Sequence, residues 1–189
     1  MAGVRGSMGL CPQYDVLFDE MTVEEHLKFF CGLKGYPEPL IDSEIDRLLD
    51  ELSLQDKKRS AASALSGGMR RKLSVAIALC ADSKVVMFDE PTSGMDPTAR
   101  RLTWDLLQRE KKGRTILLTT HYMDEADLLG DRIAIMASGQ IQCCGISFFK
   151  IFHCHMAVTI NLTRSTEMIS FNIDFSFQRV GFFQDLLCS

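Results

Sequence analysis

The stretch KVVMFDE at residues 84–90 decides the fold, because a run of apolar residues ends in two acidic ones. The continuous apolar run at 84–88 is typical of a strand buried on both faces of a parallel sheet. Parallel sheets bind ligands at the carboxyl ends of their strands. There Asp89 could hold Mg²⁺, largely through water, and Glu90 could act as a general base. The alternative, two solvated acids at a strand end, is made less favourable by the PTSGMD sequence that follows.

The residues on either side of this stretch predict alternating helices and strands. Helices are expected to begin at Ser66 and at Pro97, the second ending at Gly113, and a short acidic helix is expected at 123–129. The strand predictions are 8–12, 115–119 and 132–136, the last of which continues into an edge hairpin. This order indicates an α/β fold with a parallel sheet.

Two amphipathic helices before Ser66 predict a small helical lobe over about residues 22–82. Thr22 and Glu25 have the spacing of a capping box, and Gly35 ends the first helix. The second helix is expected to begin at Asp42 or Ser43, with its apolar residues on one face.

The last forty residues differ in pattern from the rest. Apolar and polar residues alternate at 158–163 and again at 170–177, which is typical of half-buried strands. We therefore predict a first domain at 1–149 and a separate, incomplete β-containing appendage at 150–189.

Composition narrows the class of protein. The chain has 189 residues, 46% hydrophobic and 24% charged, which is enough for one core with a small appendage. A net charge of −4 argues against nucleic acid as a partner, and the basic run 70–72 is interpreted as a solvated helix face. Seven cysteines without C-x-x-C spacing argue against a disulfide framework or zinc site and for a reducing compartment.

Neither a signal peptide nor a membrane-spanning segment is expected. Residues 1–9 lack an apolar core segment, and no apolar run reaches the ~18 residues that a spanning helix needs. Any membrane role is therefore expected to come through a partner.

Three further places could bind phosphate or the Mg²⁺ ion that accompanies it. Ser66, Gly67 and Gly68 would present backbone N–H groups and a hydroxyl to an anion, although the same triplet is also a common helix start. His121 follows a buried strand and could contact a γ-phosphate, or be an ordinary loop histidine. Gln13 could bind Mg²⁺ or its water, but alone it resembles a surface amide.

Taken in order, these segments resemble the nucleotide-binding domain of ATP-binding cassette (ABC) proteins. Gln13 matches the Q-loop, 65–69 the signature motif, 85–90 the Walker B strand with its catalytic Glu, 93–96 the D-loop and His121 the H-loop. The resemblance implies a P-loop NTPase-type sheet and the cofactors ATP and Mg²⁺. Five motifs in one order are far more specific than any single motif.

The resemblance also implies roles for individual residues. It makes Glu90 the general base and His121 the γ-phosphate contact, with Gln13 and Asp89 near Mg²⁺. The signature motif of each domain faces the ATP of a second domain. The residues implied to bind nucleotide are Gln13, Leu65, Ser66, Gly67, Gly68, Asp89 and Asp96.

The flanking sequence over about residues 8–145 resembles subfamily A, the lipid exporters, including TTHYMDEAD at 119–127 and GQIQCCG at 139–145. This implies a second nucleotide-binding domain and transmembrane domains as partners, lipid as an indirect substrate, and a place at the cytoplasmic face of a membrane.

One family motif does not occur in the sequence: no G-x-x-x-x-G-K-[ST] phosphate loop, or Walker A, is present. By family logic this loop supplies most of the hold on the β- and γ-phosphates. We therefore expect the chain to bind nucleotide poorly alone and not to hydrolyse ATP by itself.

Several interpretations stay open. The chain could be a segment of a transporter ATPase, or a non-catalytic module that pairs with an intact ABC transporter. It could also be a truncated product without a settled role, with exposed sheet edges. A chromosome-maintenance ATPase is a weaker alternative, because no heptad arm appears.

Overall fold

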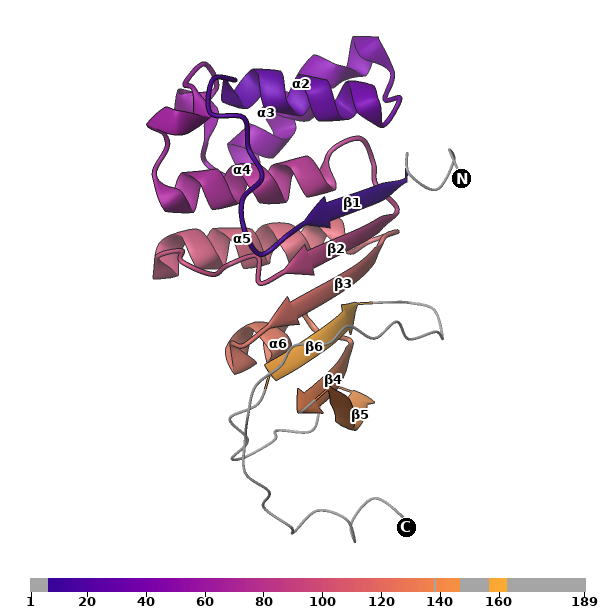
Figure 1. The fold of residues 1–189 in the computed structure, drawn as a ribbon. Coiled ribbons are helices and arrows are strands. Elements are labelled where there is room, and N and C mark those ends of the chain that lie inside the picture. The colour runs from indigo at the N-terminus through magenta and orange to yellow at the C-terminus, as the bar shows by residue number, and fades with distance from the viewer. Residues whose placement is uncertain (1–6, 138, 147–156, 163–189) are drawn as a thin grey trace, which may run out of the picture.

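The computed structural model describes residues 7–137, 139–146 and 157–162. Along the chain, a first strand and a helical lobe precede alternating helices and strands (Figure 1). The elements are β1 Met8–Cys11, α2 Val23–Leu33, α3 Glu38–Glu51, the 3-10 turns η1 Gln55–Lys57 and η2 Ala62–Ala64, α4 Gly67–Leu79, β2 Val85–Asp89, α5 Pro97–Glu110, β3 Thr115–Thr120, α6 Met123–Leu129, β4 Arg132–Ala137, β5 Gln140–Ile146 and β6 Ala157–Leu162. The predicted α/β class is confirmed.

The strands form one sheet in the order β1-β2-β3-β6-β4-β5. β1, β2 and β3 are parallel, β4 and β5 form the predicted antiparallel hairpin, and β6 is antiparallel to both β3 and β4. In this register Cys11 lies opposite Phe88, and Asp89 lies opposite Thr119. The carboxyl ends of the three parallel strands therefore meet at one edge.

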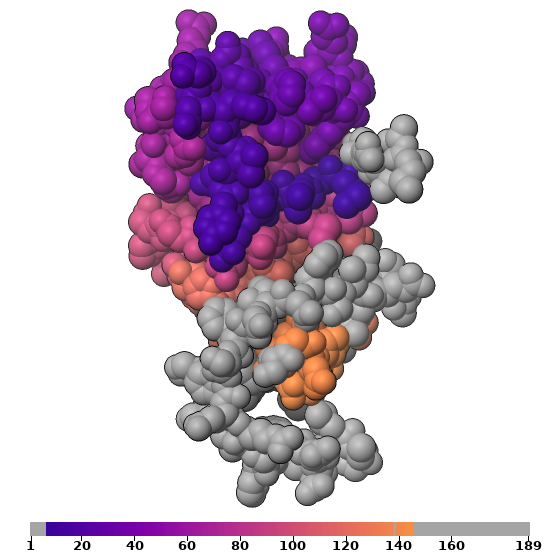
Figure 2. Space-filling view, viewed as in Figure 1, coloured from indigo at the N-terminus to yellow at the C-terminus, as the bar shows by residue number. Residues whose placement is uncertain are grey.

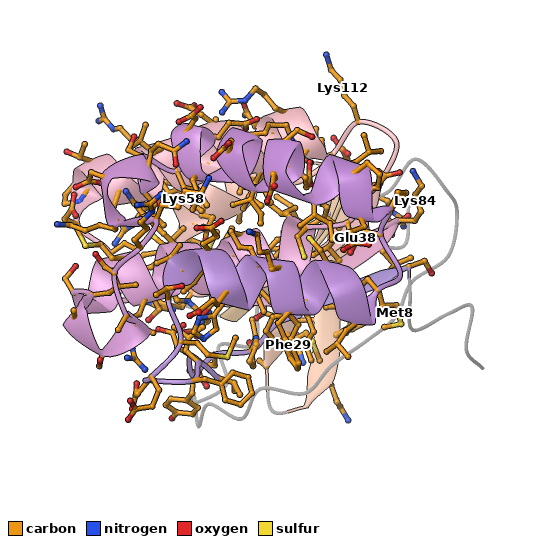
Figure 3. All side chains as sticks on the ribbon, turned by 90° about the horizontal axis from the view of Figure 1, so that it is seen from above. Met8, Phe29, Glu38, Lys58, Lys84 and Lys112 are labelled. Atoms are coloured by element: carbon orange, nitrogen blue, oxygen red, sulfur yellow. The ribbon has the colours of Figure 1, made fainter. Side chains whose placement is uncertain are left out.

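The opposite end of the sheet is visible from above. Met8 begins β1, Lys84 immediately precedes β2 and Lys112 precedes β3; all three lie at the same end of the molecule (Figure 3). The loops that follow β1, β2 and β3 consequently share the other end.

The strand predicted for 158–163 is present as β6, which pairs with β3 and β4 within the main sheet. The second alternating stretch, 170–177, lies outside the described residues. The domain division near residue 150 stays a prediction, because 157–162 is the only part of 150–189 that the structure describes.

The prediction that β2 is buried on both faces was wrong. Val86 and Phe88 are buried toward α4 and α5, whereas Val85 is 36% exposed. On the same face of β1, Leu10 is 60% exposed, and the indigo residues of β1 and the segment after it form part of the front surface in the space-filling view (Figure 2). The physical reason is the period-two alternation of a strand, since α4 and α5 cover one face of β1 and β2.

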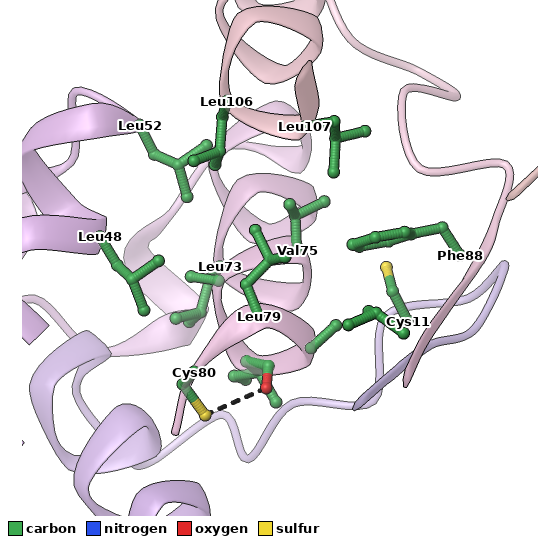
Figure 4. Close-up of a cluster of buried hydrophobic side chains, with 14 of the residues drawn as sticks. Cys11, Leu48, Leu52, Leu73, Val75, Leu79, Cys80, Phe88, Leu106 and Leu107 are labelled. Atoms are coloured by element: carbon green, nitrogen blue, oxygen red, sulfur yellow. Dashed lines mark hydrogen bonds between the residues drawn. The ribbon is translucent and has the colours of Figure 1, made fainter. Parts of the chain in front are cut away.

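Helix α4 occupies the centre of the core, between helices α2 and α3 and the sheet (Figure 1). Leu48 of α3 and Leu52, which directly follows α3, approach it from one side and Phe88 of β2 from the other (Figure 4). Strand β1 packs so closely against α4 that a Cβ added at Gly9 would lie 1.9 Å from the carbonyl oxygen of Ala78. This contact fixes the strand against the helix.

Local sequence signals set most helix ends. The predicted capping box is confirmed, because the Thr22 hydroxyl accepts from the Glu25 N–H and the Glu25 carboxylate accepts from the Thr22 N–H. The predicted start of α3 at Asp42 or Ser43 was wrong, since α3 begins at Glu38. Pro39 is the reason: proline fits the first helical turn, where its missing N–H has no intrahelical partner.

None of the described helices has both the length and the apolar character that crossing a membrane requires.

Candidate functional site

Three predicted side chains converge at the carboxyl edge of the sheet. Gln13 follows β1, Glu90 follows β2 and His121 follows β3. The Gln13 Nε2 donates to Glu90 Oε2 over 3.5 Å, and His121 Nδ1 lies 3.2 Å from Glu90 Oε1. Glu90 is therefore the centre of a group that three neighbouring strands assemble.

Asp89 is the last residue of β2 and lies beside this group. Its Oδ1 accepts a hydrogen bond from the Thr119 hydroxyl on the adjacent strand, which orients the carboxylate. Asp89 and the amide of Gln13 provide oxygen ligands, the type that Mg²⁺ prefers. The described residues contain no group of three or more potential metal-ligating His, Cys, Asp or Glu side chains. The donor set thus fits a Mg²⁺ ion that keeps waters and phosphate oxygens as its other ligands.

The backbone of Glu90 is strained. Its φ is 49°, in the left-handed region, which disfavours a residue with a Cβ by roughly 1–2 kcal/mol. The Glu90 N–H donates to the Thr119 carbonyl oxygen over 3.0 Å, and the side chain is only 12% exposed. Strain of this kind persists only where the surroundings enforce it, and it is frequent at functional sites.

His121 is the open member of the group, with 43% of its side chain exposed. Its ring lies against the Tyr122 ring, with centroids 4.0 Å apart, and the Arg100 guanidinium covers the Tyr122 ring at 3.9 Å. These contacts hold the imidazole at the surface of the site while leaving it accessible to a ligand.

The signature turn, Leu65–Gly68, has a different character. Ser66 caps α4 by accepting from the Met69 N–H over 3.4 Å, so the helix-start interpretation holds. Ser66 and Gly67 are nevertheless exposed, and a Cβ built at Gly67 or Gly68 would meet no atom within 4 Å. The Leu65 side chain is buried in the core, which leaves only its backbone for a ligand.

Asp96 of the D-loop is exposed and caps α5. Its carboxylate accepts from the N–H groups of Ala99 and Thr98, and these bonds, the Ala99 bond first, hold the pKa of Asp96 below its ordinary value. Asp96 therefore has a structural task at its position, and its role at a nucleotide stays a prediction.

The interpretation of residues 70–72 as a solvated face was wrong. Arg71 is 3% exposed and Lys72 is 9% exposed. Lys72 donates to the Leu52 carbonyl oxygen in the lobe, and Arg71 reaches the loops at the carboxyl edge. A usable signal existed, because Arg71 precedes the buried Val75 by one helical turn and thus shares its face.

Glu125 is a second functional candidate that sequence reasoning missed. It is fully buried on α6, and its Oε1 accepts from the Thr92 hydroxyl over 2.9 Å and from the Trp104 indole N–H over 2.8 Å. Burial raises the pKa of Glu125 above its ordinary value. The residue links the helix after His121 to the segment after Glu90, and its place one turn before the buried Leu129 could have indicated this.

Comparison with known proteins places this geometry in a family. Residues 1–93 match the family model described as ABC transporter. The chain is 61% identical over 149 residues to Phospholipid-transporting ATPase ABCA3 of Mus musculus, covering 79% of this chain and 9% of that protein. It is 48% identical over 169 residues to ATP-binding cassette sub-family A member 7 of Rattus norvegicus, covering 89% of this chain and 8% of that protein.

A solved structure described as the ATP binding subunit of an ABC transporter matches with a TM-score of 0.68 and 29% identity, over 75% of this chain and 60% of that chain. The chain therefore belongs to the nucleotide-binding domains of ABC transporters, and within them to subfamily A. It spans less than a tenth of the length of the curated relatives named above, 9% and 8%.

Proposed function

We propose that this chain is the part of a transporter ATPase that, in a complete assembly, couples ATP binding and hydrolysis to lipid movement across a membrane. The observation that carries the proposal is the convergence of Gln13, Glu90 and His121 at the carboxyl edge of β1, β2 and β3. Relatives that are named phospholipid-transporting ATPase support lipid as the transported class.

The side chains at this edge divide the chemistry between them. Asp89 and Gln13 would hold Mg²⁺, which when bound would offset negative charge on the phosphates. The Glu90 carboxylate accepts a proton from the attacking water, and its low exposure keeps it in a poorly solvated place. His121 donates toward the γ-phosphate from its exposed position beside Glu90.

The signature turn acts on a second nucleotide. Its backbone N–H groups stand at the N-terminus of α4, an arrangement that favours anions. Because Ser66 and Gly67 are exposed and the glycines have open space around them, the turn can approach ATP held by a second nucleotide-binding domain. Leu65 takes part through its backbone, and the exposed Asp96 takes part from the N-terminus of α5.

A complete site needs a phosphate loop from outside these 189 residues, since the motif G-x-x-x-x-G-K-[ST] does not occur within them. The proposed partners are accordingly a second nucleotide-binding domain and the transmembrane domains of a transporter. These would place the chain at the cytoplasmic face of a membrane.

A reconstitution assay tests the proposal. The purified chain alone is expected to show negligible ATP hydrolysis with Mg²⁺. Joined in one chain behind the phosphate-loop segment of a subfamily A nucleotide-binding domain, it is expected to hydrolyse ATP when two such chains pair, and Glu90→Gln should abolish this activity. Asp105→Asn, an exposed change on α5, is the matched control and should leave activity intact. Strong turnover by the chain alone, or no turnover by the joined chain, contradicts the proposal.

The exposed signature turn also favours a second candidate, a non-catalytic module that completes a partner's site. Two measurements separate the functions: hydrolysis by the joined chain, and stimulation of an intact subfamily A domain by the unjoined chain. A catalytic role predicts that Glu90→Gln abolishes hydrolysis by the joined chain. A purely completing role predicts that Gly67→Asp abolishes stimulation while Glu90→Gln leaves it unchanged.

A further inference from the structure

We propose that Arg71 is a positioning residue that holds the acidic turn, Asp89–Thr92, in the conformation that directs Glu90 toward Gln13 and His121. The inference concerns the shape of the acidic turn, and only its consequence for catalysis rests on the proposed function. Arg71 is a basic side chain on α4, the helix that follows the signature turn, and it is almost completely buried.

The hydrogen-bonding capacity of Arg71 is fully used. A guanidinium has five N–H donors, and the structure provides five acceptors. Nε donates to the Pro91 carbonyl oxygen at 3.1 Å, one terminal nitrogen to Pro12 O at 2.6 Å and Asp15 Oδ1 at 3.0 Å, and the other to Asp89 O at 2.5 Å and Glu90 O at 2.9 Å. A surface arginine has no such set of fixed partners.

Three of these acceptors are the consecutive carbonyls of Asp89, Glu90 and Pro91. For three successive carbonyl oxygens to reach one planar group, the backbone must curl around it. That curl contains the left-handed φ of 49° at Glu90. On the other side, the Glu90 N–H is bound to the Thr119 carbonyl oxygen of β3. Arg71 and β3 together therefore enforce a backbone conformation that Glu90 disfavours by itself.

The same guanidinium holds the segment that carries Gln13. Pro12, its neighbour in sequence, accepts from Arg71, and so does the Asp15 carboxylate, which also accepts from the Ser74 hydroxyl at 2.8 Å. The two side chains that meet at 3.5 Å, Gln13 and Glu90, thus stand on segments joined through one residue of the signature helix. A displacement of α4 would therefore move both of these segments.

Lysine cannot replace this residue. Its ammonium has three donors and no planar fork, so at least two of the five acceptors would lose their hydrogen bond from residue 71. The buried charge is balanced by Asp15, whose side chain is 19% exposed against 4% for Arg71. Arg71→Lys therefore preserves the charge while removing the geometry.

Amide hydrogen exchange on the chain without nucleotide tests the structural claim. Arg71→Lys is expected to speed exchange of the Glu90 amide at least about tenfold more than that of the α3 amides, because the acidic turn opens locally. Lys72→Met is the matched control, since Lys72 is buried on the same helix but bonds to Leu52 of the lobe. Equal acceleration of all amides by Arg71→Lys would mean a general structural role and overturn the proposal.

A second measurement covers the case in which Arg71→Lys does not fold. Asp15→Asn weakens one of the five contacts and should speed Glu90 exchange in the same direction by a smaller factor. In the backgrounds Glu90→Gly and Glu90→Ala, Asp15→Asn should lower the thermal midpoint less with glycine, which accepts a left-handed φ freely. Equal midpoint losses in both backgrounds would contradict the claim.

Activity provides the remaining readout. In the reconstitution assay Arg71→Lys is expected to lower kcat at least about tenfold with little change in the KM for ATP, since Arg71 orients Glu90 without facing the nucleotide. An equal change in both parameters would overturn the positioning role. Hydrogen exchange needs no nucleotide, so unchanged exchange of the Glu90 amide in Arg71→Lys would reject the role of Arg71 and leave the proposed function intact. Altered exchange together with no reconstituted hydrolysis would reject the proposed function and leave the role of Arg71 intact.

Discussion

The acidic turn and the signature turn are both expected to face phosphate, yet the structure builds them in opposite ways. The acidic turn is held by Arg71, β3 and Glu125, and it contains a strained residue. The signature turn has one side-chain hydrogen bond at its cap, exposed residues and open space at its glycines.

The difference follows from what each turn must meet. A group that activates water works best when its position is fixed before the ligand arrives. A turn that meets a ligand on another domain must stay at the surface, where its backbone N–H groups can be approached. Changes in the acidic turn should therefore affect stability and activity together, and changes in the signature turn should affect activity with little effect on stability.

Removal of the guanidinium is expected to have the largest effect. Arg71→Met removes five hydrogen bonds, four to backbone carbonyls and one to Asp15. Asp15 keeps its bond from the Ser74 hydroxyl, and the Glu90 carbonyl keeps its bond from the Ser93 N–H. We expect the free energy of unfolding in urea to fall by about 3–5 kcal/mol. Arg101→Met, at an exposed position of α5, should change it by less than about 0.5 kcal/mol. If Arg71→Met lowered the free energy of unfolding only slightly, the proposed difference between the two turns would be wrong.

The next effect depends on pH and involves Glu125. Burial raises its pKa in the folded protein above the ordinary value of 4.5, so the folded state binds this proton more tightly than the unfolded chain. The stabilising contribution is complete below about pH 4.5 and is lost as the pH rises through the raised pKa. Each tenfold difference in proton affinity between the folded and unfolded states corresponds to about 1.4 kcal/mol of this contribution.

Glu125→Gln abolishes this titration while its amide oxygen can still accept from Thr92 and Trp104. The stability of Glu125→Gln relative to the unmodified chain should therefore increase as the pH rises, as measured by denaturation at several pH values. Thr98→Ala, an exposed change on α5 that removes no titratable group, should show no such trend. A difference that is independent of pH contradicts the expectation.

The strain at Glu90 predicts an inverted preference between glycine and alanine. Because φ is 49°, Glu90→Gly should be more stable than Glu90→Ala by about 1 kcal/mol. At Asp105, within α5, alanine should be the more stable choice by a similar amount. Thermal unfolding of the four variants measures both differences, and the same sign at both positions would show that Glu90 is not strained.

The smallest effect on stability is expected at the signature turn. Gly67→Ala adds a Cβ into open space at the first position of α4, so the free energy of unfolding should change by less than about 0.5 kcal/mol. Hydrolysis that depends on a second domain should nevertheless fall strongly, because the added methyl occupies the place of the approaching phosphate. Unaltered partner-dependent hydrolysis would remove the signature turn from the proposed site.

Local patterns predicted a large part of this molecule. The order of strands and helices, the capping box at Thr22 and the grouping of Gln13, Asp89 and His121 at one edge all follow from periodicity and from parallel strands ending together. Two predictions failed for different reasons. The start of α3 was misplaced because a local signal, Pro39 in its first turn, was missed, whereas Val85 lies on a face of the sheet that α4 and α5 leave uncovered.

The sequence alone determined which chemistry is present, because five motifs in one order define a nucleotide-binding domain of an ABC transporter. Only the tertiary structure decided which charged side chains lie inside, since burial of Arg71 and Glu125 depends on segments far apart in the chain. It also decided the left-handed φ of Glu90, which no local signal predicts for a glutamate. That conformation depends on α4, β2 and β3 meeting at one point, and their meeting is a property of the fold.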